Sequence, residues 1–389
     1  MSGPRENPST STVAISDPEN KDAHVPAQSN MHANGQVEGE SSSGMKNSKG
    51  WDGKLRLPKS VLVTNPEALS DPDYSDDSNV LPGEEIEADQ DLLSHMESDS
   101  REITYTHARI TSIPSLNLER FKELTHLCLR QNNIQNIESI AHVAPNLVEL
   151  DLYDNLISHM RGLDELTSLT SLDLSFNKIK HIKHIDDMAQ LRDLYLVANK
   201  ISRIEGLQGL HSLTMLELGS NRIRELQNLD SLKNLKELWI AKNKISELKG
   251  LAGLSNLRLL SIQSNRIRDL SPLREIPGLE ELYISHNAFE SLDGLEHNTK
   301  LQTLDISNNK VQSLKGLESL SNLEELWASY NQLGDFGDVE KVLADKKSLT
   351  TVYFEGNPMQ LRAPVLYRNK VRLALPQIKQ IDATFVKAS

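Results

Sequence analysis

The chain of 389 residues has a single cysteine, Cys128, which excludes a disulfide framework and is typical of a reducing compartment. It has no run of 18 consecutive apolar residues, so we expect no membrane span. Residues 1–20 contain no apolar stretch, so we also expect no signal peptide. These absences together predict a soluble protein of the nucleus and cytoplasm.

The sequence also lacks the motifs of common catalytic and metal sites. It has no Gly-rich phosphate loop, no Cys-x-x-Cys pair, no His-Glu-x-x-His and no Gly-x-Ser-x-Gly. Cys128 lies two residues from His126, but no third group that would orient such a pair for catalysis can be identified. We therefore predict a protein that is not an enzyme and that binds no metal or cofactor.

Residues 1–100 differ in composition from the rest of the chain. They are rich in Ser, Asn, Pro, Gly and acids, and acidic residues cluster between Asp71 and Asp91. Such a segment buries too little apolar surface to offset its ordering entropy, so we predict a disordered acidic tail. A regulatory arm with phosphorylatable serines such as Ser70 is the alternative. The net charge of −13 disfavours nucleic acid as a partner and favours basic protein surfaces.

What the chain has in abundance is one short phrase, Leu-x-x-Leu-x-Leu-x-x-Asn, which recurs from Leu124 to Asn357. Successive asparagines are 22 residues apart between Asn155 and Asn331, whereas the first step is 23 and the last is 26. This phrase and period are typical of leucine-rich repeats. The asparagines are Asn132, Asn155, Asn177, Asn199, Asn221, Asn243, Asn265, Asn287, Asn309, Asn331 and Asn357.

The spelling of one repeat predicts its structure. Leu-x-Leu alternates like a short strand with one buried face, and such a strand buries its leucines only by stacking on its neighbours. We expect an α/β solenoid, a horseshoe with a parallel sheet on the concave side. A 22-residue repeat is too short for a full outer helix, so extended or 3₁₀ turns are expected on the convex side. The asparagine amide is expected to satisfy backbone groups where the chain leaves the strand.

The ends of the repeat array are degenerate. Residues 101–123 read as a damaged repeat with Ala108 in place of asparagine, which predicts an N-terminal cap. Residues 124–357 form the repeats, and residues 358–389, with an expected helix over 367–375, form a C-terminal cap. The longer insert at 334–347 has apolar residues at helical spacing, which predicts a convex-side helix there.

Function is expected in the strand residues that alternate with the leucines, because these point out of the concave wall. The two outward columns hold nine acids, three tyrosines and two of the chain's three tryptophans but no Lys or Arg, although lysines are plentiful just after the asparagines. Aromatic anchors ringed by charge are typical of a protein interface, here for a basic patch on a folded partner. The predicted partner-binding residues are Glu149, Asp151, Asp173, Tyr195, Glu217, Trp239, Tyr283, Asp305, Glu325, Trp327 and Tyr353.

The uniform repeat, the segment Met215–Arg224 and the ending at Leu375–Val386 closely resemble a family, the leucine-rich repeat regulatory subunits of protein phosphatase 1. The resemblance implies that the concave wall binds the catalytic subunit of the phosphatase, often in the nucleus. This binding is expected to control the activity, assembly or location of the catalytic subunit. Family interface positions correspond here to Asp173, Tyr195, Glu217, Trp239, Asp305, Glu325, Trp327 and Tyr353.

Two points stay open on the sequence alone, the further partners and the alternative function. A second phosphatase regulator joining in a ternary complex is one open possibility, and apart from its partners the chain is expected to be monomeric. The alternative function is a general leucine-rich repeat scaffold for a different protein complex.

Overall fold

The computed structural model of the chain describes residues 92–386. The predicted disordered tail therefore falls largely on residues 1–91, outside the described part, as does Ser70.

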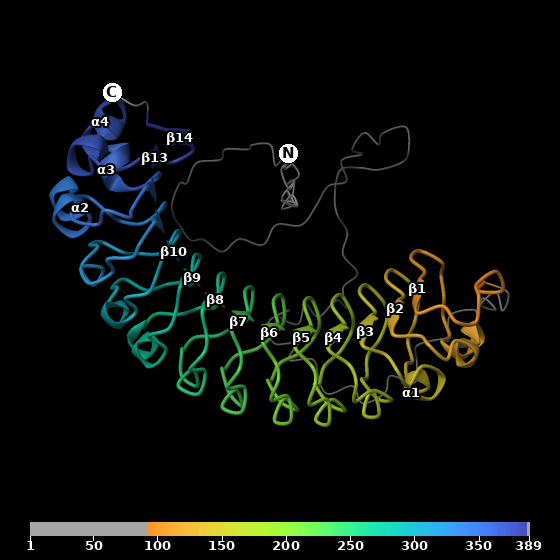
Figure 1. Ribbon diagram of the computed structural model, residues 1–389. Helices are drawn as coiled ribbons and strands as arrows, with labels where there is room; N and C mark the ends of the chain where they lie inside the picture. The colour runs from red at the N-terminus through yellow and green to blue at the C-terminus, as the bar shows by residue number, and fades with distance from the viewer. Residues whose placement is uncertain (1–91, 387–389) are drawn as a thin grey trace, which may run out of the picture. The chain divides into compact units, whose positions relative to one another are not determined.

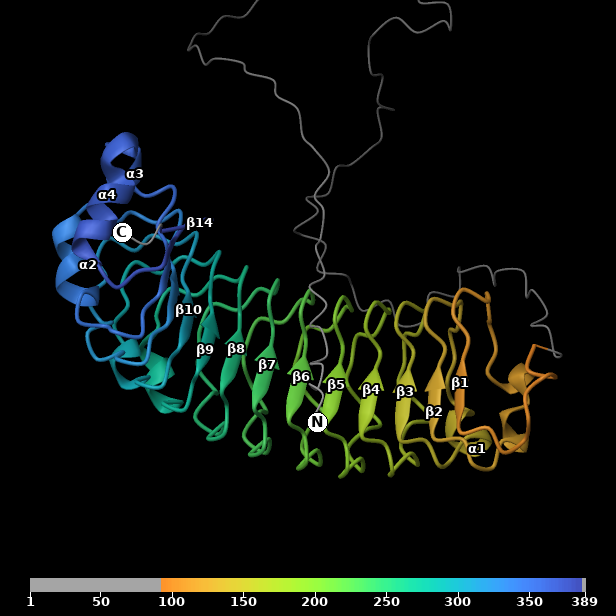
Figure 2. The ribbon, with the colours of Figure 1, turned by 45° about the horizontal axis from the view of Figure 1, so that its top comes forward.

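A single sheet of 14 strands runs the length of the described region, with the strands side by side in chain order (Figures 1 and 2). All neighbours are parallel except the last pair, which is antiparallel. The strands are β1 (Glu102–Thr104), β2 (His126–Cys128), β3 (Glu149–Asp151), β4 (Ser171–Asp173), β5 (Asp193–Tyr195), β6 (Met215–Glu217), β7 (Glu237–Trp239), β8 (Leu259–Ser261), β9 (Glu281–Tyr283), β10 (Thr303–Asp305), β11 (Glu325–Trp327), β12 (Thr351–Tyr353), β13 (Gln380–Ile381) and β14 (Thr384–Phe385).

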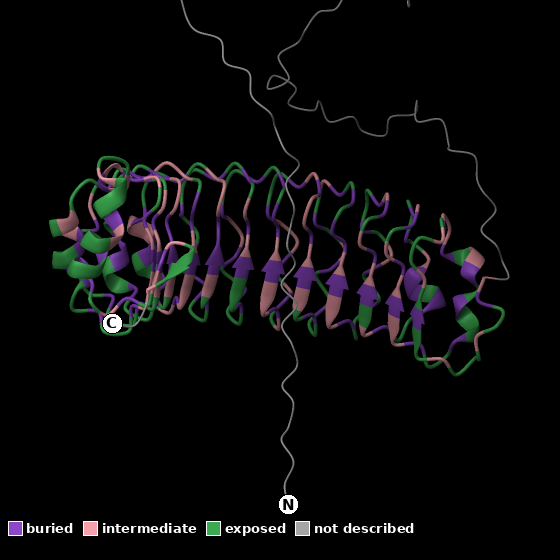
Figure 3. Cartoon of the chain, turned by 90° about the horizontal axis from the view of Figure 1, so that it is seen from above, coloured by how far each residue is buried: buried purple, intermediate pink, exposed green. Residues whose placement is uncertain are grey.

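Each repeat strand has three residues, and the middle one is buried. Leu216 of β6, for example, pairs in register with Leu194 of β5 and Leu238 of β7, and all three are fully buried. The flanking residues of each strand face the concave side, where Figure 3 shows purple alternating with pink or green along the arrows. The predicted parallel concave sheet and leucine core are confirmed.

The repeated asparagines form a ladder of buried or half-buried amides beneath the turns that follow the strands. Asn221 donates through Nδ2 to the carbonyl oxygens of Leu196 and Leu218, at 2.8 and 3.1 Å. Its Oδ1 accepts from the backbone N–H of Ile201 at 3.0 Å. The same pattern recurs along the stack, so each amide links its own repeat to the preceding one, as the sequence predicts.

The convex side consists mostly of turns, because 22 residues leave no length for a full helix there. Its regular pieces are η1 (Pro114–Leu116), η2 (Leu118–Arg120), α1 (Ile140–Val143), η3 (Ser271–Glu275) and η4 (Leu295–His297). The 26-residue step contains α2 (Phe336–Leu343), whose Val339, Val342 and Leu343 are buried, so the helix predicted in this insert is confirmed. Within residues 92–386, no helix is long and apolar enough to cross a membrane.

The N-terminal end is closed by β1 and by residues 92–100, which the sequence analysis placed in the tail. Leu93 is 2 % exposed and joins the core, and Met96 packs against it. The Tyr105 hydroxyl donates to the Leu92 carbonyl at 3.1 Å. These few apolar residues gain burial at the open end of the stack, so the folded region begins before residue 101.

The C-terminal end is closed by α3 (Pro358–Leu361), α4 (Pro364–Ala374) and the β13–β14 hairpin. Helix α4 starts three residues before the expected helix at 367, with Pro364 in its first turn. Tyr367 on this helix donates to both oxygens of the Asp382 carboxylate, at 3.2 and 2.9 Å. The Asp382 carboxylate also accepts from the N–H groups of Phe354 and Glu355, so it ties the cap to the last full repeat.

Candidate protein-binding site

The concave face, defined as the first and third residues of strands β2–β12, carries all the predicted partner-binding residues. Because the strands pair in register, these residues form two straight columns across the sheet. Most are half-buried, since each side chain rests against its neighbours in the same column.

Four aromatic side chains of the third-residue column make a continuous row, here called the aromatic row: Trp239, Tyr283, Trp327 and Tyr353. The rings of Trp239 and Tyr283 are stacked, with centroids 6.4 Å apart. The Tyr283–Trp327 and Trp327–Tyr353 centroids are 6.2 and 5.8 Å apart, in tilted and edge-on arrangements. Such contacts hold the rings in fixed orientations before any partner arrives.

The small residues between the rings make this row possible. Trp239 and Tyr283 are two strands apart, roughly 10 Å at the usual strand spacing, so their rings meet by leaning over the intervening Ser261. Asp305 lies in the same way between Tyr283 and Trp327. Ser261 is consequently 2 % exposed and Asp305 7 % exposed. We predicted Asp305 as a residue that a partner touches, but in the free protein the neighbouring rings cover it, and its Oδ1 accepts from the Ser307 N–H at 2.9 Å.

A glutamate two residues earlier in the same strand holds the polar atom of each of three rings. Trp239 and Trp327 donate through Nε1 to Glu237 and Glu325, both at 3.2 Å. The Tyr283 hydroxyl donates to Glu281 at 2.7 Å. Burial, together with Glu281, raises the pKa of Tyr283. Glu237 and Glu281 were absent from the predicted site, although the recurring Glu-Leu-aromatic tripeptide was a usable signal.

Toward the N-terminal end, the concave face is acidic rather than aromatic. Burial, followed by the nearby Asp173 charge, raises the pKa of Glu217. Burial also raises the pKa of Asp173 and of Asp193. The pKa of Tyr195 is raised by burial and then by the surrounding carboxylates, Asp193 first among them. These carboxylates are therefore under-compensated, and a cation placed among them would be stabilised.

The acidic side chains of strand β3 are better compensated, because cationic or titratable side chains lie beside them. Asp151 accepts from Arg130 at 2.9 Å, and Glu149 lies 3.7 Å from His126. Arg130 comes from the loop after β2, outside the columns that the sequence analysis considered. Burial is the main cause that raises the pKa of the Cys128 thiol, which disfavours its thiolate. Among residues 92–386, no group of three or more His, Cys, Asp or Glu could hold a metal ion.

Comparison with known proteins agrees with this architecture. The family model of leucine rich repeats in two copies matches five overlapping windows within residues 211–341, and the related leucine rich repeat model matches 122–179 and 169–223. Together the two models span residues 122–341.

Segments of the chain are also similar to proteins named as phosphatase regulators. The relative named protein phosphatase 1 regulatory subunit SDS22 from Schizosaccharomyces pombe is 50 % identical over 86 residues, which is 22 % of this chain and 25 % of the relative. The protein of the same name from Saccharomyces cerevisiae is 45 % identical over 88 residues, 22 % of this chain and 26 % of its own length. Human protein phosphatase 1 regulatory subunit 7 is 51 % identical over 55 residues, 14 % of each chain. The matches therefore span about a quarter or less of these relatives.

Solved structures share the fold. An internalin (inlF) from Listeria monocytogenes aligns with a TM-score of 0.58 at 24 % identity, covering 75 % of this chain and 88 % of that one. A leucine-rich repeat protein from Leptospira interrogans aligns with a TM-score of 0.56 at 26 % identity, covering 68 % and 73 %. These likenesses support the solenoid architecture.

Proposed function

We propose that this chain, which belongs to the leucine-rich repeat family, acts as a non-catalytic regulatory subunit. It binds the catalytic subunit of protein phosphatase 1 through its concave face. The partner presents a basic patch that lies over the acidic repeats and an apolar surface that lies over the aromatic row. Binding controls the activity, assembly or location of the phosphatase.

The observation that carries this proposal is the aromatic row with its glutamates. Trp239, Tyr283 and Trp327 are half-buried by one another yet open to the concave side, and each is held by a hydrogen bond to a carboxylate. Rigid aromatic anchors lose little side-chain entropy on binding, which is why they dominate interfaces. The absence of Lys and Arg from both columns adds a single sign of charge.

The names of the relatives support the choice of partner. Three relatives that match parts of this chain at 45–51 % identity are named as regulatory subunits of protein phosphatase 1. The match to each is partial, so the partner assignment comes from these names together with the chemistry of the concave face.

A pull-down from cell extract with the full chain as bait tests the choice of partner. The catalytic subunit of protein phosphatase 1 is the expected dominant protein, and it should be lost when Trp239 and Trp327 are both replaced by alanine. Capture of an unrelated complex without the phosphatase would favour the alternative, a general scaffold. A phosphatase assay with and without the purified chain then determines the direction of control.

The finer parts of the proposal concern assembly and location. We propose that the chain is monomeric apart from its partner, that a second phosphatase regulator can join the complex, and that the protein works in the nucleus and cytoplasm. Light scattering of the purified chain and of the reconstituted complex measures the first two, and imaging of the tagged protein measures the third.

A further inference from the structure

The loops that leave strands β4–β8 have the opposite charge to the concave face. We call them the basic edge, defined as residues 175–180, 197–202, 219–224, 241–246 and 263–268. These five segments hold nine Lys or Arg and no Asp or Glu. The proposed function uses none of these cations, so the basic edge needs its own explanation.

The cations of the basic edge stand in a row. One follows the ladder asparagine directly in five consecutive repeats: Lys178, Lys200, Arg222, Lys244 and Arg266. Because the strands pair in register, neighbouring members are separated by about one strand spacing, ~4.8 Å or a little more. Within the part of the chain that the structure describes, Lys178, Lys200 and Lys244 form no ion pair. A row of like charges at this spacing is self-repulsive, and an anionic chain along it would relieve the repulsion.

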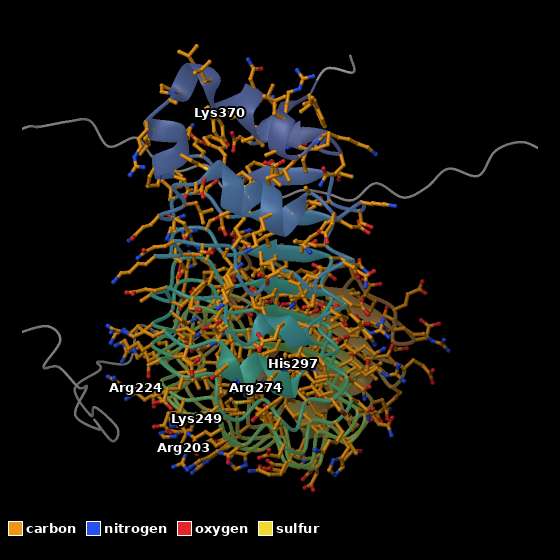
Figure 4. The ribbon with its side chains drawn as sticks, turned by 90° about the vertical axis from the view of Figure 1, so that its left-hand side faces the viewer. Arg203, Arg224, Lys249, Arg274, His297 and Lys370 are labelled. Carbon is orange, nitrogen blue, oxygen red and sulfur yellow. The ribbon has the colours of Figure 1, made fainter. Side chains whose placement is uncertain are left out.

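A pocket of about 340 Å³ opens next to this row, between two repeats. Ser202, Arg203, Arg224, Glu225 and Gln227 line it. Figure 4 shows the labelled Arg203 and Arg224 on the same side of the solenoid. Two guanidinium groups beside a hydroxyl suit a carboxylate, which accepts paired hydrogen bonds from arginine.

The acids that flank the basic edge on the convex side are partly occupied already. Glu247 pairs with Lys249 at 2.6 Å, and Asp269 accepts from the N–H and the hydroxyl of Ser271 at 2.9 and 2.7 Å. They therefore leave Lys178, Lys200 and Lys244 with much of their charge uncompensated.

We propose that the basic edge binds an extended acidic peptide segment and that residues 84–91 of the same chain supply it. These residues lie outside the described part, so their sequence and length carry the choice. Five of the eight are acidic, and Glu85, Glu87, Asp89 and Asp91 alternate with other residues. In an extended chain, alternate residues face one side about 6.6 Å apart, which is comparable to the spacing of the cations.

The segment is long enough to reach the row. Leu92 lies at the N-terminal end of the solenoid, where its carbonyl accepts from Tyr105, the residue that follows β1. Lys178 and Lys200 follow β4 and β5, three and four strands further on, which is about 15–20 Å. Five to eight extended residues before Leu92 reach about 17–27 Å, which places Glu84–Glu87 along the row. Because the segment is tethered, even weak contacts produce substantial occupancy.

A peptide fits the basic edge better than a nucleic acid. Single-stranded nucleic acids bind on aromatic platforms as well as cations, and the five segments contain one aromatic residue, Phe176.

Distance measurement by pulsed electron paramagnetic resonance on the full chain tests the proposal. Cys128 is replaced by serine, and nitroxide labels are placed at Ala88→Cys and Ser246→Cys, the latter exposed on the basic edge. Docking predicts a narrow peak in the distance distribution at about 20 Å. In the docked state Ala88 lies about three strand spacings from Ser246, and the two label arms add to that separation. The Lys178→Glu/Lys200→Glu variant should lose the peak. The Lys300→Glu/Lys347→Glu variant, which changes the net charge equally at exposed sites elsewhere, should keep it.

Circular dichroism serves as the control that each variant is folded. The narrow peak should vanish in about 0.5 M salt, where exposed charges are screened. It should also vanish when added polyglutamate competes for the edge. A broad distribution in the parent chain, or the same distribution in both double variants, overturns the proposal. Displacement by oligouridylate at lower concentration than by polyglutamate overturns the choice of a peptide.

Discussion

Replacing Asn221 by alanine tests how the asparagine ladder holds the solenoid together. The carbonyl groups that accept hydrogen bonds from this amide keep other donors when it is removed. The Leu196 carbonyl also accepts from Asn199, and the Leu218 carbonyl also accepts from Asn243. The Ile201 N–H has no such second acceptor, so the replacement leaves it buried and unpaired. An orphaned buried donor costs about 1–3 kcal/mol, and the weakened carbonyl bonds add about 1 kcal/mol, so we expect a loss of about 3 kcal/mol.

Asn309 provides a matched control in the same ladder. Its Nδ2 donates to the carbonyls of Ile284 and Ile306 in the usual way, but its Oδ1 has no hydrogen-bond partner among the described residues. Asn309→Ala therefore removes the same atoms without orphaning an N–H, and it should cost only about 1 kcal/mol.

Urea unfolding of the two variants and the parent, with the slopes compared to detect loss of cooperativity, measures the difference. Hydrogen exchange at the Ile201 amide should accelerate in Asn221→Ala alone. Equal costs for the two substitutions would refute the view that the ladder works mainly by satisfying the N–H of the preceding repeat.

Two further predictions concern titration and the C-terminal cap. Because burial and Asp173 raise the folded-state pKa of Glu217, the folded state holds this proton more tightly than the unfolded state, so stability from this group is lost as pH rises through that pKa. Glu217→Gln should raise the melting temperature at pH 7 by up to about 2 °C. It should give no gain at a pH below 4.5, the ordinary pKa of the glutamate side chain. A gain of equal size at pH 7 and below pH 4.5 would contradict the raised pKa as its cause. Tyr367→Phe removes the hydrogen bonds to Asp382 and should lower the free energy of unfolding by about 1–2 kcal/mol in urea titrations, whereas an unchanged midpoint would show that packing alone holds α4 in place.

The fold and the strand positions that face the concave side could be predicted because one physical rule repeats along the chain. Leu213, Leu216 and Leu218 are all fully buried, and the residues between them face outward, because a strand alternates and the stack is in register. The ladder role of Asn221 and the helix at the insert before Leu349 follow from the same pattern.

Features that depend on how side chains share space could not be predicted in this way. That Asp305 is covered depends on the rings of Tyr283 and Trp327 leaning together over it, which strand alternation does not encode. The role of Arg130 depends on a loop side chain turning back toward Asp151. The burial of Leu93 depends on an isolated leucine finding the open end of the core, without any periodic signal around it.

The most direct test of the proposed concave-face interaction is the dissociation constant of the purified phosphatase 1 catalytic subunit for the full chain, compared with that for Trp239→Ala/Trp327→Ala. Each buried tryptophan anchor contributes about 2–4 kcal/mol, so the double variant should bind at least about 700-fold more weakly while staying folded. Exposed-lysine changes at Lys300 and Lys347, away from the concave face, should leave the constant unchanged. An unaltered dissociation constant in the folded tryptophan variant would contradict the account.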